Sequence, residues 1–275
     1  MPFETDGGGV SGEAWDLREN LVDEFDSDEL FLVNPSVETV DTVVNVAFDE
    51  ESQEFRILVE ESVMKSSVND FPFATKAADL VDQDRFEFGA LEELPRNSML
   101  LGDERVVVLV TDDDQVLGVT STSDNLLTSL SESYMEYWGQ SEPFKFRTPP
   151  LSIIRETLEQ DFSDEFLGDF DAAFDSLETM QDEGEMIDEV SLFLLLAAKH
   201  GELLYDISKW GEDNGVASKA TFSRSKTTLE DLGLIDTEKV PIDVGRPRLR
   251  LLLGHEDLED VDGGELATVA QSLIT

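Results

Sequence analysis

The sequence contains no cysteine and only two histidines, His200 and His255. Without cysteine the chain has no disulfide bond, no thiol nucleophile and no zinc site built from thiolates. Neither histidine has a second histidine near it in sequence, so we expect neither to be catalytic or to bind a metal. No apolar run approaches the roughly 18 residues of a membrane-spanning helix.

Basic residues are also scarce, since 19 Lys and Arg stand against 63 Asp and Glu and give a formal net charge of −44. The acidic residues alternate with apolar ones instead of forming the blocks of a disordered tail. Folded proteins of salt-accumulating organisms have this composition, because molar salt shortens the Debye length to about 3 Å and reduces self-repulsion. We therefore predict a cytoplasmic protein of an extreme halophile.

Acidic residues are not spread evenly. The window 199–250 holds nine of the basic residues and nine acidic ones, so it is neutral within a strongly acidic chain. Two stretches, 214–229 and 244–255, contain no acidic residue at all. A surface without acidic residues in an otherwise acidic protein favours binding of an anionic partner.

The N-terminal half predicts an α/β domain over residues 21–140. Residues 1–20 are acidic and Gly-rich at the start, lack the features of a secretory signal, and are expected to be a disordered tail. Strands are expected at 30–33, 55–59, 86–88 and 98–101, with helices at 36–48, 61–80 (broken near Pro72) and 123–138. A hairpin is expected at 105–121, and we interpret the acidic run Asp112–Asp114 in its turn as solvated surface and not as a metal site.

Residues 141–185 predict a linker followed by a helical region, because three prolines between Gly139 and Pro150 break both periodicities. Ser163 is a plausible N-cap for the helix that follows. Its apolar stripe has two interpretations, packing in the core of the chain or a homodimer seam. The stripe consists of Phe166, Phe170, Phe174, Leu177 and Met180.

Residues 186–254 predict a winged helix-turn-helix. Helices are expected at 187–199, 202–213 and 218–232, with a turn at Gly215, a stop at Gly233 where Leu234 folds back onto Leu229, and a hairpin over 235–253. The last stretch, 255–275, is expected to be an acidic tail with at most a short helix.

The third helix is expected to face the major groove of DNA. Phe222, Ser225, Leu229 and Leu232 share one face at helical spacing and are predicted to point inward. The opposite face is small, polar and basic, which allows close approach to base edges. The predicted contacts on this helix are Ser218, Lys219, Ser223, Arg224, Lys226 and Thr227.

The hairpin is expected to act as the wing. Arg246 lies between Gly245 and Pro247 at the predicted tip, where an extended arginine can enter a narrow minor groove. Arg248 and Arg250 alternate with leucines and therefore share one strand face. Double-stranded DNA is the predicted partner, and a winged-helix scaffold that binds only protein is the alternative. No catalytic motif, metal site or cofactor site is present, so we do not expect an enzyme.

Three segments resemble the haloarchaeal TbsP-type regulators: SIIRETLEQDF, LLYDISKWGEDNGVASKATFSRSKT and EKVPIDVGRPRLRL. The resemblance extends over about residues 29–253 and implies a sequence-specific regulator of metabolic genes. The α/β part is similar to the phospholipase-D-like effector domain of TrmB-type sugar regulators, which implies control by a metabolite or a partner. That part contains no histidine, so phosphodiesterase chemistry is not expected, and the domain order is the reverse of that in TrmB-type proteins.

Overall fold

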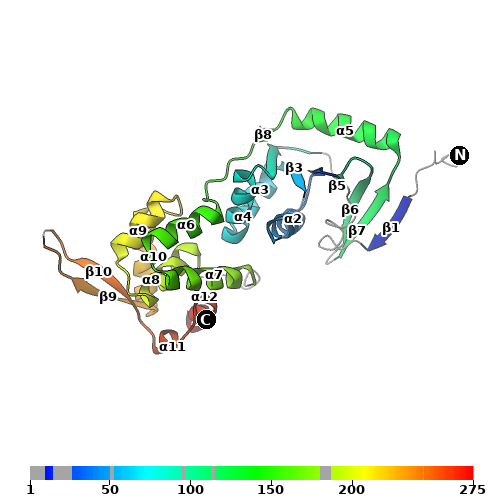
Figure 1. Ribbon diagram of the computed structural model, residues 1–275. Helices are drawn as coiled ribbons and strands as arrows, with labels where there is room; N and C mark the ends of the chain where they lie inside the picture. Colours follow the sequence, from blue (N-terminus) through cyan, green and yellow to red (C-terminus); the bar gives the residue numbers. More distant parts are fainter. Residues whose placement is uncertain are drawn as a thin grey trace. The chain divides into compact units, whose positions relative to one another are not determined.

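The computed structural model describes residues 10–14, 27–49, 53–94, 97–112, 115–179, 187–243 and 245–274. The chain divides into two compact units, Met1–Phe146 and Arg147–Thr275, each with its own core (Figure 1). Within the described residues no helix is both long and apolar enough to cross a membrane.

The first unit is built on an eight-stranded mixed sheet with the strand order β1-β7-β6-β5-β2-β3-β4-β8. Strands β2, β3 and β4 pair in parallel, and the remaining neighbours pair antiparallel. The strands are β1 (Val10–Ala14), β2 (Glu29–Val33), β3 (Glu54–Glu60), β4 (Phe86–Leu91), β5 (Ser98–Leu101), β6 (Val106–Asp112), β7 (Gln115–Ser121) and β8 (Glu142–Pro143).

Helices cover both faces of this sheet, which explains why its strands are apolar at consecutive positions. Helices α2 (Val37–Asp49), α3 (Glu61–Ser67) and α4 (Phe71–Asp82) contribute to a core that contains Leu32 and Ile57. Helix α5 (Asp124–Trp138) contributes to a second core that contains the next residue of each strand, Val33 and Leu58. The mixed α/β class is as predicted.

Two segments differ from the expectations for this unit. Val10–Ala14 lies in the predicted disordered tail, yet it forms β1 and pairs with β7. Glu142–Pro143 lies in the predicted linker, yet it forms β8 on β4, and Phe144 and Phe146 pack on the first core. Neither segment has a long apolar pattern, because each is a short strand at a sheet edge. Asp113 and Asp114 of the acidic turn lie outside the described residues.

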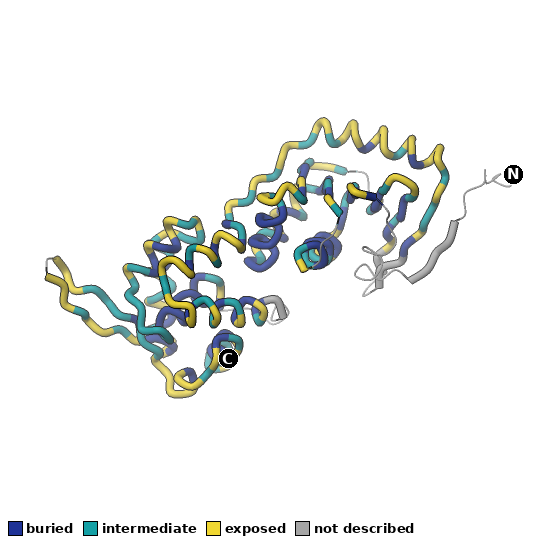
Figure 2. The backbone as a smooth tube through the Cα atoms, viewed as in Figure 1, coloured by how far each residue is buried: buried dark blue, intermediate teal, exposed yellow. Residues whose placement is uncertain are grey.

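The second unit is helical around a buried central helix. It comprises α6 (Leu151–Asp161), α7 (Asp164–Thr179), α8 (Glu189–Lys199), α9 (Leu204–Asp213), α10 (Lys219–Asp231), β9 (Ile235–Val240), β10 (Arg248–Leu253), α11 (Glu256–Glu259) and α12 (Gly263–Ile274). Helix α8 begins where Asp188 accepts a hydrogen bond from the Ser191 N–H (2.8 Å), and its residues from Val190 to Ala198 are all buried (Figure 2). The rest of the unit packs around α8.

The phenylalanine stripe of α7 belongs to this core. Phe166, Phe170 and Phe174 are at most 1% exposed, and the Phe170 ring stacks on Phe193 of α8 with the centroids 5.4 Å apart. Ser163 caps α7 by accepting from the Phe166 N–H at 3.2 Å. The stripe is therefore core packing and not a dimer seam. Met180 lies outside the described residues.

The C-terminal stretch forms α11 and a 12-residue helix, α12, so a short helix is present and the stretch packs on the unit instead of forming a tail. Leu266, Ala267 and Ala270 are buried at helical spacing, and α12 packs on α7. The close approach depends on Gly263, where a Cβ would lie 2.4 Å from the Asp169 carbonyl oxygen. Because the residues at this contact are small, they form no clear apolar stripe in the sequence, and the packing of α12 was not predicted.

Asp169 joins three segments of this unit. Its carboxylate accepts from the Gly263 N–H (3.1 Å) and contacts Lys199 Nζ (3.0 Å) and His200 Nε2 (2.8 Å). Burial raises the pKa of Asp169, but the hydrogen bonds from Lys199 and His200 lower it by a larger amount. The pKa of Asp169 therefore lies below its ordinary value. The contribution of Asp169 to stability is therefore present above the pKa of the unfolded chain and is lost as the pH falls through the folded pKa. His200 has a structural partner here, and His255 begins α11 as its N-cap.

Candidate nucleic-acid interface

Helix α10 is fixed at both ends by the residues that the sequence indicated. The Ser218 hydroxyl accepts from the Thr221 N–H at 3.2 Å, and Gly215 turns the chain before it with φ +79°. At the other end Gly233 has φ +75°, and the Leu234 N–H donates to the Leu229 carbonyl at 2.9 Å, as in a Schellman motif. The ends fix which residues of α10 face the core and which face solvent.

The inward face of α10 consists of Phe222 and Leu229, which are at most 2% exposed. Ser225 is half-buried, but Leu232 is 39% exposed, so its predicted inward position is wrong. Leu232 is the C-cap residue, and the reversal at Gly233 brings Leu234 to the core in its place. The buried apolar positions of α10 therefore end at Leu229, about one turn before Leu232, although the helix continues to Asp231.

The outward face of α10 is polar and carries one arginine without a carboxylate partner. Ser223, Arg224 and Thr227 are exposed. Arg224 Nε donates to the Ala220 carbonyl at 3.2 Å, and Nη2 lies 3.5 Å from Thr221 Oγ1, so the side chain is aligned along the helix. Among the described residues no Asp or Glu forms an ion pair with Arg224. Its remaining donors therefore face solvent and are able to contact a ligand.

Lys226 has a structural position instead. Its side chain is 13% exposed and forms an ion pair with Glu230 one turn later. The other Glu230 oxygen accepts from Thr237 Oγ1 at 2.9 Å, which attaches β9 to α10. Lys226 was predicted to contact DNA, and in the structure it is linked to β9 through the shared carboxylate of Glu230. The sequence could not separate these roles, because the contact with β9 is tertiary.

The wing is the antiparallel pair β9–β10, which is tied to the start of α9. Leu251 N–H donates to the Glu202 carbonyl at 2.9 Å, and Leu203 bridges to Arg250. Arg250 Nη1 lies 2.9 Å from Glu238, its direct neighbour on β9. These contacts hold the base of the wing, while Arg246 near the tip is exposed.

Arg248 connects the wing to α9 through two contacts. Its guanidinium lies over the Tyr205 ring, 4.1 Å from the centroid, and Nη1 is 3.2 Å from Asp206 Oδ1. An arginine that stacks on an aromatic ring keeps part of its donor edge for other ligands. Tyr205 itself is 46% exposed, which is unusual for an aromatic side chain without a partner surface.

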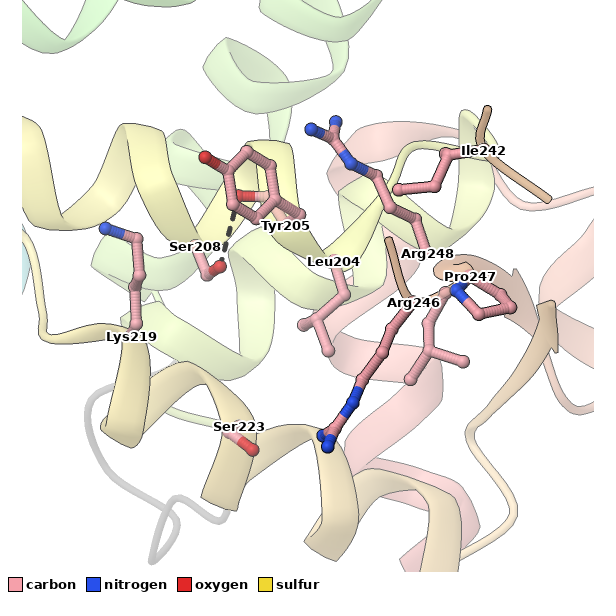
Figure 3. Close-up of a pocket in the computed structure, with 10 residues that line it drawn as sticks. Leu204, Tyr205, Ser208, Lys219, Ser223, Ile242, Arg246, Pro247 and Arg248 are labelled. Carbon is pink, nitrogen blue, oxygen red and sulfur yellow. Dashed lines mark hydrogen bonds between the residues drawn. The ribbon is translucent and has the colours of Figure 1, made fainter. Parts of the chain in front are cut away.

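A groove of about 480 Å³ lies between α9, α10 and the wing (Figure 3). Among the described residues its wall contains three cations, Lys219, Arg246 and Arg248, and no carboxylate. In the view of Figure 3 the Arg246 side chain points from the wing towards α10. The other lining residues are Leu204, Tyr205, Ser208, Ser223, Ile242, Pro247 and Leu249. This wall of cations contrasts with the net charge of −44 for the whole chain.

Sequence reasoning missed the contribution of α9 to this groove. None of the predicted contact residues lies on that helix, yet Leu204, Tyr205 and Ser208 line the wall. Tyr205 and Ser208 are three residues apart and therefore share a helix face, which was a usable signal. Six of the nine predicted contact residues are cations, and the groove gathers three of them, while Arg224, Lys226 and Arg250 lie outside its wall.

Lys219 is held by Glu212 of α9. The two side chains form an ion pair, and the other Glu212 oxygen accepts from the Lys219 N–H at 3.4 Å. The hydrogen bond from Lys219 lowers the pKa of the Glu212 carboxyl. Among the described residues of the winged helix, Arg224, Lys239 and Arg246 are the cations that form no ion pair. No cluster of metal-ligating side chains occurs among the residues that the structure describes.

The fold and this site define a two-unit protein with an α/β domain and a C-terminal winged helix-turn-helix. Residues 15–149 match the model of the TbsP-like transcriptional regulator N-terminal domain, and residues 150–271 match the model of the TbsP-like C-terminal HTH domain. The two matches adjoin and take in nearly the whole chain. The chain therefore belongs to the family of TbsP-like transcriptional regulators.

Comparison with the curated proteins gives no match. Among the solved structures, one similar chain is TrmBL2, an archaeal chromatin protein whose structure is described as showing a novel mode of DNA binding. The two chains are 19% identical with a TM-score of 0.38, over 49% of this chain and 53% of the other. The similar region thus spans about half the length of TrmBL2.

Proposed function

We propose that this protein is a sequence-specific DNA-binding transcription regulator in which α10 enters the major groove and the wing contacts the adjacent backbone and minor groove. The observation that supports this proposal is the groove wall, where the described residues include three cations and no carboxylate beside the outward face of α10. Phosphates are the anions that such a surface meets on DNA, and the small side chains of α10 permit close approach to base edges. Lys226 and Ser218 hold α10 in place in this proposal.

A mobility-shift titration in molar KCl tests the proposal against its alternative. A regulator of this kind forms a discrete complex with its operator that survives an excess of unrelated DNA. A winged-helix scaffold that binds only protein gives no complex with any fragment. Chromatin immunoprecipitation of the tagged protein supplies the operator for this assay, and it also tests our proposal that the targets are metabolic genes.

Arg246→Lys is expected to weaken operator binding although the charge is retained, and Arg246→Ala is expected to weaken it more. Arg246 is exposed and forms no ion pair among the described residues, so its planar donors are available for a narrow minor groove. Molar salt weakens the counterion release on which a point charge depends. The measurement is a titration against operators with A·T-rich or G·C-rich flanks at one salt concentration.

The preference for the A·T-rich flank is expected to fade in both Arg246 variants. Lys239→Ala is a matched control, because Lys239 is the other exposed wing cation without an ion pair and lies on β9. If Arg246→Lys equals the wild type on both DNAs, Arg246 acts only as a charge and the minor-groove assignment is wrong.

The proposal has two further parts, a sensing role for the α/β unit and a homodimer in the cytoplasm of a halophile. The α/β unit is a compact unit with its own two-sided core, which suits a non-catalytic effector domain for a metabolite or partner. Removing residues 1–146 is then expected to abolish the response of the target genes to carbon source.

Winged helices commonly pair on two half-sites, which favours the homodimer. Because the α7 stripe is buried, the contact between subunits uses another surface. Light scattering in molar KCl distinguishes a dimer from a monomer, and a monomer both with and without operator contradicts this part of the proposal.

A further inference from the structure

Three exposed cations among the predicted DNA contacts are each paired with a carboxylate of the same chain. The pairs are Lys219–Glu212, Arg248–Asp206 (3.2 Å) and Arg250–Glu238 (2.9 Å). Both partners of every pair are between 36% and 51% exposed, so water and salt reach them. Exposed pairs of this kind are weak and exchange partners readily.

Two of these cations, Lys219 and Arg248, line the groove wall, whereas their partners Glu212 and Asp206 do not. Glu212 also accepts from the Lys219 N–H at the start of α10, the kind of position at which helices bind phosphate. In the free protein a carboxylate of the chain itself therefore takes the contacts that a DNA phosphate would take.

We propose that Glu212, Asp206 and Glu238 are displaceable counter-ions that lower the affinity of this surface for DNA phosphates. This inference rests on the proposed function. Operator and unrelated DNA present the same phosphates, so both must displace the carboxylates at the same cost. Only the operator adds base contacts, so this cost keeps the binding of unrelated DNA weak while the operator still binds.

The salt dependence of DNA binding is expected to show whether these carboxylates act as counter-ions. Each phosphate that a cation neutralises releases about 0.9 of a cation condensed on the DNA. When the cation leaves a carboxylate to make that contact, the freed carboxylate attracts salt cations and offsets part of the release. Removing the carboxylate charge removes this offset, so the slope of log K against log salt steepens by up to about one unit per contact. Neutralising acidic residues elsewhere on the chain reduces the net negative charge equally, but it is not expected to steepen the salt slope in this way.

The experiment compares two triple variants of the full-length chain with equal charge. The test variant is E212Q/D206N/E238Q, and the control is E165Q/E259Q/E265Q, which neutralises exposed acids on α7, α11 and α12. Each variant is titrated with operator and with unrelated DNA over a range of KCl concentrations. Circular dichroism confirms that both variants are folded, and the substitutions are nearly isosteric.

We expect the test variant to bind unrelated DNA roughly tenfold more tightly than the control variant, with a steeper salt slope. Its affinity for the operator is expected to rise by a similar factor, because the operator displaces the same carboxylates. Equal affinities and equal slopes for the two variants overturn the inference. A wild-type chain that binds no DNA instead overturns the proposed function, so the two failures are distinguishable.

Discussion

Gly211→Ala is expected to destabilise the winged-helix unit by about 1–3 kcal/mol, the usual cost of overpacking a filled core. A Cβ at position 211 of α9 would lie 2.3 Å from Phe222 Cε2 and 2.5 Å from Phe222 Cζ. The Phe222 ring is fully buried, so it has no free space into which it can turn. Relief of the clash requires α9 and α10 to separate.

That separation also affects DNA binding, because α9 and α10 form two walls of the groove. Operator affinity is therefore expected to fall even at temperatures where the unit is still folded. Thermal unfolding followed by circular dichroism measures the stability, and the transition of the winged-helix unit must be resolved from that of the α/β unit.

Gly168→Ala is the matched control. Gly168 lies within α7, and nothing lies within 4 Å of the position that its Cβ would take. The same substitution there is expected to stabilise the protein by roughly 0.5–1 kcal/mol, because alanine loses less backbone entropy than glycine in a helix. If both variants shift the transition in the same direction, close packing at Gly211 is not what holds α9 against α10.

The winged helix was predictable because its signals are local. Ser218, Gly215 and Gly233 mark the ends of α10 through capping and positive φ, and these depend on residues a few positions apart. The apolar spacing of Phe222 and Leu229 sets the buried face of the helix. Local propensity and tertiary packing agree here, which is when sequence patterns predict structure well.

The electrostatic arrangement of the interface was not predictable in the same way. Arg248 pairs with Asp206, a residue 42 positions earlier, and the partner of Lys226, Glu230, accepts a hydrogen bond from Thr237 of the wing. A helical or strand period reports which face a side chain occupies, but it carries no information on the acid that lies opposite. The sequence therefore gives the candidate cations, whereas the structure separates those with a carboxylate partner from Arg224 and Arg246.

The short strands β1 and β8 and the packing of helix α12 were not predicted for a different reason. β1 is five residues long and contains Gly12, and β8 has two residues, so neither shows an alternating apolar pattern. α12 docks through Gly263 and alanines, whose small side chains contribute little to an apolar stripe. In each case the partner strand or helix supplies the stabilisation, and a single-segment pattern cannot record it.

Arg224→Ala is expected to lower operator affinity by about 1–3 kcal/mol, or roughly 5- to 150-fold, the value of one bidentate base contact. Arg224 lies in the middle of the exposed face of α10, and hydrogen bonds to Ala220 and Thr221 align its side chain. Because Ser223 and Thr227 on the same face are small, they allow α10 to approach the floor of the major groove.

The loss is expected to depend on sequence, which separates a base contact from a phosphate contact. A bidentate contact to guanine is lost with the arginine, so the variant no longer discriminates at one base pair, while the other positions keep their preferences. Titration against a set of operators with single base-pair substitutions measures this. Alanine is a strong helix former, so α10 is expected to keep its structure in circular dichroism.

Lys145→Ala provides the charge-matched control, since Lys145 is an exposed cation in the other unit of the chain. It makes the net charge more negative by the same amount and is expected to change operator affinity little in molar salt. Arg224→Lys adds a second comparison, because an ammonium keeps the charge but loses the planar pair of donors. Equal losses on operator and unrelated DNA for Arg224→Ala would assign Arg224 to the phosphate backbone, and the base contact would have to lie elsewhere on α10.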